Sequence, residues 1–204
     1  MRSDAARLIL LVAGITLLAG SLAWSQDALT DTVPPQARYL GELQRAWSVG
    51  VLMGYPDGSY RPDDLHSRAE LWAGFNRLID VAYQAKAPFL LGDISPTYAR
   101  GVRDHWGFAS FERLLAVKLL EHRPMPHVRD MDAFVERLEC AQLAVATLRG
   151  FGRLEKSMAP AELCIGDIMV RQADGKVYFH DAMPRWEFAV AMSRLLDAII
   201  PAGG

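Results

Sequence analysis

Three segments of the 204-residue chain repeat one arrangement of polar and apolar positions. Each opens with Arg-x-Glu and continues in a run whose apolar residues recur at helical spacing, which predicts an amphipathic helix. The opening arginines are Arg68, Arg137 and Arg185, and in the first and third segments a second arginine, Arg77 or Arg194, follows the glutamate by seven residues. Because such a helix cannot bury its apolar face alone, the repeat predicts three units that pack into one core.

In the first two units another helix is predicted ahead of the Arg-x-Glu helix. The first covers residues 39–49 and ends at Gly50, a residue type that commonly terminates helices, and the second covers residues 106–117. The corresponding stretch of the third unit contains Pro160, which disfavours a helix there. Each unit is therefore a helix, a loop and a helix, and we expect a mainly α domain from about residue 37 to residue 200.

The N-terminus has the pattern of a secretory signal peptide, which we assign to residues 1–25. Arg2 and Arg7 flank its start, residues 8–23 are almost wholly apolar, and small residues would allow cleavage after Ala23 or Ser25. The alternative is an uncleaved single-span anchor, for which the apolar stretch is short. Residues 26–37 form a polar lead. This pattern predicts an exported protein of the cell envelope or cell surface that meets the membrane only through the signal segment.

Composition narrows the possible functions. The chain is 51% apolar with a formal charge of −2, which disfavours disorder and gives no basic surface for nucleic acid. Its two cysteines, Cys140 and Cys164, are too few for a disulfide framework; outside the cytoplasm they would either form one bond or pack as free thiols. The histidines and acidic residues show neither metal-ligand spacing nor a catalytic motif, so we expect no enzyme, no metal and no cofactor.

One loop and one helix start carry a family resemblance. Residues 50–62 read Gly-Val-Leu-Met-Gly-Tyr-Pro-Asp-Gly-Ser-Tyr-Arg-Pro, residues 67–70 read Ser-Arg-Ala-Glu, and His105-Trp106 opens the second unit's first helix. These motifs resemble the S-layer homology (SLH) repeat, whose signature is Gly-x-x-x-Gly-Tyr-x-Asp-Gly-x-Phe-x-Pro followed by Thr-Arg-Ala-Glu. On this resemblance the units span residues 38–84, residues 85–150 including a linker, and a degenerate third unit at residues 151–200.

The resemblance implies both a fold and a partner. SLH units come in threes and form a pseudo-threefold helical bundle with grooves between the units. They are similar to modules that anchor proteins by binding acidic, often pyruvylated, cell-wall polysaccharide without catalysing a reaction. The family's carboxylate contact is the arginine of its Thr-Arg-Ala-Glu motif, which corresponds here to Arg68, Arg137 and Arg185.

The residues at the helix starts also suit a carboxylate on physical grounds. Ser67 and Glu70 have the spacing of a capping box, which places Arg68 in the first helical turn among free N–H groups. A guanidinium in that position can bind both oxygens of a carboxylate at once. The alternative for each of the three arginines is an ion pair with an acidic residue of a neighbouring unit.

Three more residues complete the predicted binding site. Gly54 would let a sugar approach the loop closely, and Asp57 would either contact the ligand or cap its own turn, the commoner role. Trp106 would stack on a sugar ring or anchor the core, and its helical spacing with Phe111 and Leu114 favours the core. The sequence thus predicts non-covalent binding of wall polysaccharide; the alternative is a degenerate scaffold that binds another envelope protein.

Overall fold

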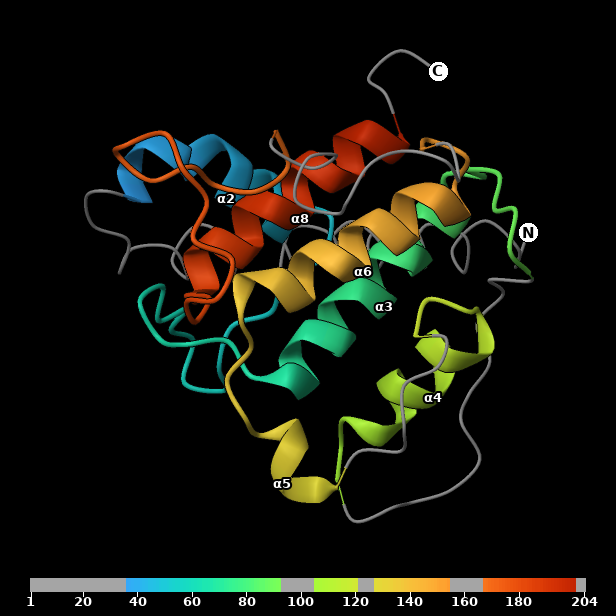
Figure 1. Ribbon diagram of the computed structural model, residues 1–204, viewed down its shortest axis with the longest axis horizontal. Helices are drawn as coiled ribbons and strands as arrows, with labels where there is room; N and C mark the ends of the chain where they lie inside the picture. The colour runs from blue at the N-terminus through green and yellow to red at the C-terminus, as the bar shows by residue number, and fades with distance from the viewer. Residues whose placement is uncertain (1–35, 93–104, 121–126, 155–166, 201–204) are drawn as a thin grey trace, which may run out of the picture.

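The computed structural model describes residues 36–92, 105–120, 127–154 and 167–200 of the chain. These residues form a mainly α fold without a β-sheet, which confirms the predicted fold class (Figure 1). The elements, in chain order, are the 3₁₀ helix η1 (Gln36–Tyr39) and the α-helices α2 (Leu40–Ser48), α3 (Arg68–Gln84), α4 (Phe108–Ala116), α5 (Val128–Met131), α6 (Arg137–Gly150) and α8 (Arg185–Ile199).

The three long helices α3, α6 and α8 begin at the arginines of the Arg-x-Glu motifs, as predicted. At α3 the capping box is complete, because the Glu70 N–H donates to Ser67 Oγ at 3.3 Å and the Ser67 N–H donates to the Glu70 carboxylate at 2.9 Å. Glu136 and Pro184 stand at the same position in the other two units and make no side-chain cap. The starts of α6 and α8 depend instead on contacts between the units.

Those contacts form a closed ring of backbone hydrogen bonds just ahead of the three helices. The Val135 N–H donates to His66 O at 3.0 Å, the Met183 N–H donates to Val135 O at 2.9 Å, and the His66 N–H donates to Met183 O at 2.9 Å. The first N–H group of each helix donates to another unit in the opposite direction around this ring: the Arg68 N–H to Ala133 O, the Arg137 N–H to Asp181 O, and the Arg185 N–H to Asp64 O. Each unit thus satisfies backbone groups of its neighbour.

The first helices of the first two units end in the same way. Gly50, just after α2, has a φ of +78°, the left-handed conformation that terminates many helices, so the predicted end is confirmed. Lys118 takes a φ of +62° at the equivalent place behind α4. The units therefore share a backbone geometry here although only one of them has the glycine that favours it.

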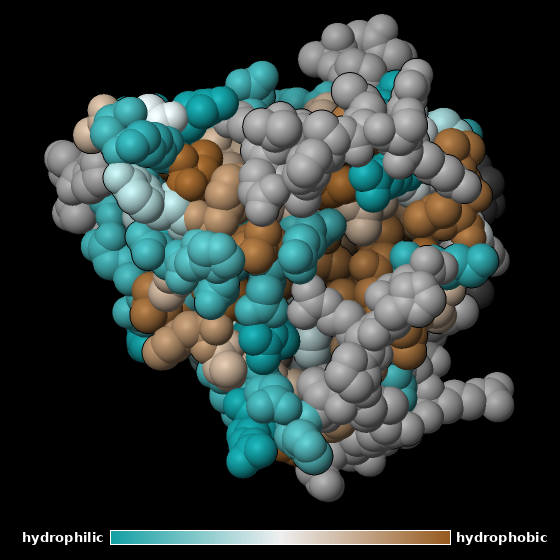
Figure 2. Space-filling model, viewed as in Figure 1, coloured by the Kyte–Doolittle hydropathy of each residue, from teal (hydrophilic) through white to brown (hydrophobic). Residues whose placement is uncertain are grey.

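Helix α8, which belongs to the third unit, packs against helices of the other two units. It contacts α2, α3 and α6, while α4 packs on α3, and Figure 1 shows α3 and α6 running alongside α8. Buried aromatic side chains from all three units fill the space between the helices, among them Phe75, Phe111 and Phe188. On the face shown in Figure 2, hydrophilic side chains cover much of the described surface and hydrophobic ones are visible between them. The core thus lies between the units, as the repeat predicted.

Several predictions concern residues outside the described part of the chain. These are the signal peptide, most of the polar lead, Cys164, and residues 155–166 with Pro160, where the first segment of the third unit would lie. Because that segment is outside the description, the pseudo-threefold packing of complete units stays a prediction. Cys140 is a buried free thiol. Among the described helices, none combines the length and apolar character needed to cross a bilayer.

Candidate functional site

The three predicted arginines are held in ion pairs between units. Each guanidinium binds the glutamate of another unit's Arg-x-Glu motif, and the pairs close a cycle that we call the arginine–glutamate ring. The pairs are Arg68–Glu139, Arg137–Glu187 and Arg185–Glu70. The alternative raised from the sequence, an ion pair with a neighbouring unit, is therefore confirmed for all three arginines.

Two of these pairs are bidentate. Arg68 Nε and Nη2 donate to Glu139 Oε2 and Oε1, both at 2.8 Å, and Arg137 Nε and Nη2 donate to the Glu187 carboxylate at 2.5 and 2.8 Å. Pairing with its glutamate raises the pKa of each of these two guanidiniums. The Arg137 and Glu187 side chains are only 9% and 3% exposed. The fork of each guanidinium, which would bind a glycan carboxylate, is already occupied by protein.

Arg185 differs from the other two because it borders a cleft. Besides pairing with Glu70, it donates from Nε to Tyr60 O and from Nη2 to Met53 O, both at 3.0 Å. These bonds tie the loop that follows α2 to the start of α8. The guanidinium carbon also lies 4.7 Å from the centre of the Tyr55 ring. Arg185 therefore fixes one wall of the cleft.

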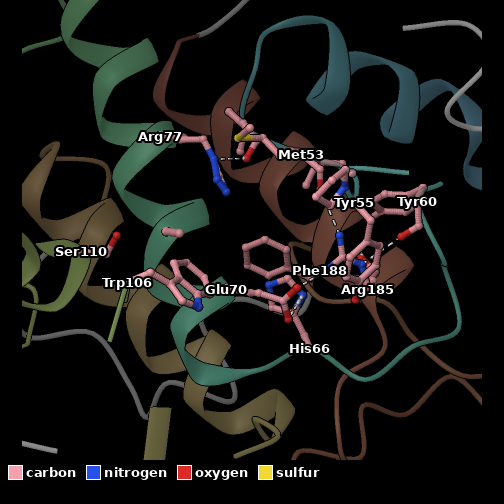
Figure 3. Close-up of a pocket in the computed structure, with 15 residues that line it drawn as sticks. Met53, Tyr55, Tyr60, His66, Glu70, Arg77, Trp106, Ser110, Arg185 and Phe188 are labelled. Carbon is pink, nitrogen blue, oxygen red and sulfur yellow. Dashed lines mark hydrogen bonds and ion pairs between the residues drawn. The ribbon is translucent and has the colours of Figure 1, made fainter. Parts of the chain in front are cut away.

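The cleft has a volume of about 630 Å³ and takes residues from all three units (Figure 3). The loop after α2, the first half of α3, the start of the second unit and the start of α8 form its walls. Of the predicted site residues, Gly54, Trp106 and Arg185 line it together, whereas Asp57, Arg68 and Arg137 are not among its lining residues.

Trp106 is 60% exposed, so the preference for a core position was wrong. The physical reason is that α4 begins at Phe108, which leaves Trp106 in the turn before the helix rather than on its buried face. Its ring stacks on His105, with centroids 5.6 Å apart and an interplanar angle of 27°. An exposed indole on a cleft wall has the geometry that a sugar ring can stack on.

Asp57 and Gly54 serve the loop itself. Asp57 accepts from the N–H and hydroxyl of Ser59 at 3.0 and 2.6 Å and pairs with Arg61, and the bonds from Ser59, with that from Arg61, lower its pKa. The commoner role foreseen for it, capping its own turn, is confirmed. A Cβ at Gly54 would lie 2.7 Å from Ser59 O and 2.9 Å from the Trp47 ring, so the loop can close there only on a glycine.

The residue that sequence reasoning missed is Arg77. It lies on α3 with Glu70 and Ala73, at the spacing that puts all three on the cleft side of the helix. Its Nε donates to Val51 O at 3.3 Å, and no carboxylate among the described residues pairs with it. Burial, followed by the charge of Arg185, lowers the pKa of its guanidinium. In Figure 3 the Arg77 side chain points toward the space bounded by Trp106 and Phe188.

The third unit contains a counterpart of Arg77 that is neutralised. Arg194 follows Glu187 by seven residues, as Arg77 follows Glu70, and it also donates to the loop ahead of its helix, from Nη1 to Met169 O at 3.5 Å. Its Nη2, however, lies 3.5 Å from the Glu42 carboxylate. The seven-residue spacing was visible in the sequence, but the presence or absence of a carboxylate partner was not.

Among the described residues, no cluster of histidine, cysteine and acidic side chains could hold a metal ion. The bound group that the cleft suits is therefore judged from its charge and its aromatic wall. Its charged side chains are Arg77, Arg185 and Glu70, of which the last two neutralise each other. One positive charge remains, which matches a ligand with a single negative group at this point.

Comparison with known proteins gives one partial similarity. A stretch of 85 residues, 39% of this chain, is 32% identical to "Cell surface glycoprotein 1" of Acetivibrio thermocellus. The chain covers only 4% of the length of that protein. No family model matches the chain, so the resemblance to the SLH family stays a prediction.

Proposed function

We propose that this protein is an exported component of the cell envelope that binds an acidic cell-wall polysaccharide in the cleft, non-covalently and without catalysis. One observation carries the proposal: the Arg77 guanidinium faces the cleft from α3 without a carboxylate partner among the described residues. The similarity to a protein named as a cell surface glycoprotein supports the location.

The energetics of Arg77 favour an anionic ligand. A partly buried guanidinium that lacks a counter-ion has lost hydration without gaining an ion pair, and the lowered pKa of Arg77 reflects that cost. A carboxylate entering the cleft would supply the missing pair through charge-assisted hydrogen bonds, in surroundings where such bonds are strong. The charge balance supports a ligand with one carboxylate at this point, as in a uronic acid or a pyruvate ketal.

The walls of the cleft favour a sugar as the carrier of that carboxylate. Trp106 offers a largely exposed indole face, and Tyr55 and Met53 line the same cleft from the loop after α2. Aromatic faces bind the C–H surfaces of sugar rings, while an arginine nearby fixes the orientation of the acidic group. The cleft would therefore recognise the substituents of the glycan through a few polar groups on a mainly apolar surface.

The alternative is a scaffold that binds another envelope protein without affinity for glycans. The internal ion pairs of Arg68 and Arg137 favour it, because these side chains would then serve only the fold. A scaffold of this kind predicts that binding does not depend on carboxylates or on Arg77.

The test is titration of the protein with purified acidic wall polysaccharide and with the same polysaccharide after chemical reduction of its carboxyl groups. We expect binding to the acidic form alone. Arg77→Met should lower the affinity at least about tenfold, because a hydrogen bond to a charged group contributes about 1.5–3 kcal/mol. Its thermal stability should be kept, since the substitution removes a buried charge that has no counter-ion.

Arg194→Met is the matched control, because it makes the same change at the paired counterpart in the third unit. It should leave the affinity unchanged. Equal binding by Arg77→Met and the unaltered protein, or equal binding of the acidic and reduced polysaccharides, would exclude the proposed function in favour of the scaffold.

A further inference from the structure

We propose that His66 is a second ligand contact in the cleft, one that hydrogen-bonds a hydroxyl of the sugar whose carboxylate Arg77 binds. This inference rests on the proposed function and deepens it, because it names a residue that would decide which acidic sugar fits. Three features of His66 support this role: its nitrogens lack hydrogen-bond partners among the described residues, the other units have apolar residues at its position, and its neighbours favour the neutral imidazole.

The imidazole of His66 is buried and unsatisfied. The residue is 5% exposed and lines the cleft, yet neither Nδ1 nor Nε2 has a hydrogen-bond partner among the described residues. Its nearest carboxylate oxygen, on Glu70, lies 4.0 Å from Nδ1, which is too far for a hydrogen bond. Because buried polar groups in folded proteins are nearly always paired, these two nitrogens are candidates for hydrogen bonds to a ligand in the cleft.

The repeat shows that the fold does not need an imidazole at this position. In the backbone ring, Val135 and Met183 occupy the place of His66 in the other two units, and both are fully buried. An apolar side chain therefore satisfies the packing at the helix starts. His66 instead places two polar nitrogens, without a partner in the described part of the chain, in this buried position, and a departure from the local packing rule of this kind is expected at functional sites.

The surroundings of His66 determine what it can bind. Burial and the charges of Arg185 and Arg77 favour the neutral imidazole and outweigh the opposing effect of the Glu70 backbone on its pKa. The Phe188 ring stacks on it at a centroid distance of 4.1 Å. In Figure 3 the labelled side chains of His66, Phe188 and Glu70 lie together at one side of the cleft. A neutral imidazole has one donor and one acceptor. A sugar hydroxyl matches it, because a hydroxyl also donates and accepts.

The experiment replaces His66 by the residues that the other units use, His66→Met and His66→Val. Both variants should fold with an unchanged helical circular dichroism signal and an equal or higher melting temperature, because an unsatisfied polar group is removed. Their affinity for the acidic polysaccharide should fall by about three- to tenfold, the usual effect of one hydrogen bond. His66→Gln, which keeps a donor and an acceptor, should retain more of the affinity than His66→Met.

The outcomes separate this inference from the function on which it rests. If the unaltered protein binds, Arg77→Met binds weakly and His66→Met and His66→Val bind normally, His66 is no ligand contact and the inference is overturned. A water molecule satisfying the same nitrogens would give that result. If the unaltered protein does not bind the acidic polysaccharide, the proposed function fails first. Gain of stability together with loss of affinity in either apolar variant supports the inference.

Discussion

The arginine–glutamate ring and the cleft share Arg185, but they differ in whether their arginines have a carboxylate partner. In the ring every guanidinium is paired with a carboxylate from another unit. In the cleft, the hydrogen-bond partner of Arg77 among the described residues is the carbonyl of Val51. The paired arginines of the ring link the units, whereas Arg77, which pairs with no carboxylate in the described part of the chain, is the residue that the proposed function assigns to the ligand.

The difference between Arg77 and Arg194 shows how little separates the two roles. Both follow the motif glutamate by seven residues and both donate to the loop ahead of their helix. The Glu42 carboxylate of α2 pairs with Arg194 and neutralises its charge. In the second unit the position seven residues after the motif glutamate is occupied by Ala146. Under the proposed function, a single change at this position would remove a ligand contact from one unit while the repeat fold is kept.

The largest effect is expected when an ion pair of the arginine–glutamate ring that does not line the cleft is disrupted. Arg137→Met should lower the free energy of unfolding by about 3–5 kcal/mol, because it leaves the buried Glu187 carboxylate without its cation. Urea unfolding measures the loss. Affinity for the acidic polysaccharide should stay unchanged under conditions where the variant is folded, because Arg137 does not line the cleft.

The double variant Arg137→Met with Glu187→Met is the control for that prediction. It should recover most of the stability, since apolar residues of similar volume often replace a buried ion pair at little cost. Arg61→Met, which removes the partner of Asp57 on the exposed loop, should have a much smaller effect than Arg137→Met. If Arg137→Met unfolds no more easily than Arg61→Met, the ring does not hold the units together.

Local signals made the helix starts predictable. Ser67 and Glu70 carry their capping box within four residues, and Gly50 ends α2 through its own backbone conformation. Both features depend on near neighbours in sequence, so the repeat revealed them. The order of the units around the arginine–glutamate ring is set by contacts between residues some 70 positions apart, such as Arg68 and Glu139. The spacing of motifs along the sequence does not predict which unit contacts which.

The function of the arginines could not be read from the sequence for a related reason. The chemistry that binds a glycan carboxylate also binds a glutamate, so Arg68 was compatible with both until Glu139 was placed beside it. Arg77 was passed over because its significance is the lack of a partner, which only the surroundings reveal. Trp106 was assigned by helical spacing, although the helix starts two residues later.

An effect of intermediate size is expected from a substitution of Gly54 that crowds the loop after α2. Gly54→Ala would force its Cβ against Ser59 O and the Trp47 ring, so stability should fall by about 1–3 kcal/mol and the cleft wall should shift. Binding should weaken with it. Gly58→Ala is the control, because nothing lies within 4 Å of its added Cβ and only the φ of +86° is strained. Thermal melts and polysaccharide titration of both variants would show whether the loop wall matters, and equal affinities would show that it does not.

A pH-dependent effect concerns His66, whose main chain belongs to the ring of backbone hydrogen bonds and whose side chain lines the cleft. Burial and the charge of Arg185 hold its pKa well below 6.5 in the folded protein, while Arg77 and Glu70 also face it. Below about pH 6.5, His66 therefore binds a proton in the unfolded chain but stays neutral in the folded protein. Above about pH 6.5 the imidazole is neutral in both states, so its protonation does not affect stability. Below that pH the free energy of unfolding falls by about 1.4 kcal/mol for each pH unit until the folded pKa is reached.

Urea unfolding at pH 7.5 and at pH 5.0 tests this dependence, with His66→Met as the matched variant. Asp57 and Asp174 also have lowered pKa values, but their contribution falls away only near the ordinary aspartate pKa of 3.8 and below, outside this interval. The unaltered protein should therefore lose more stability than His66→Met between the two pH values. Equal losses would mean that the imidazole is protonated as easily in the folded cleft as in water, which is incompatible with the buried, neutral group that the hydroxyl contact requires.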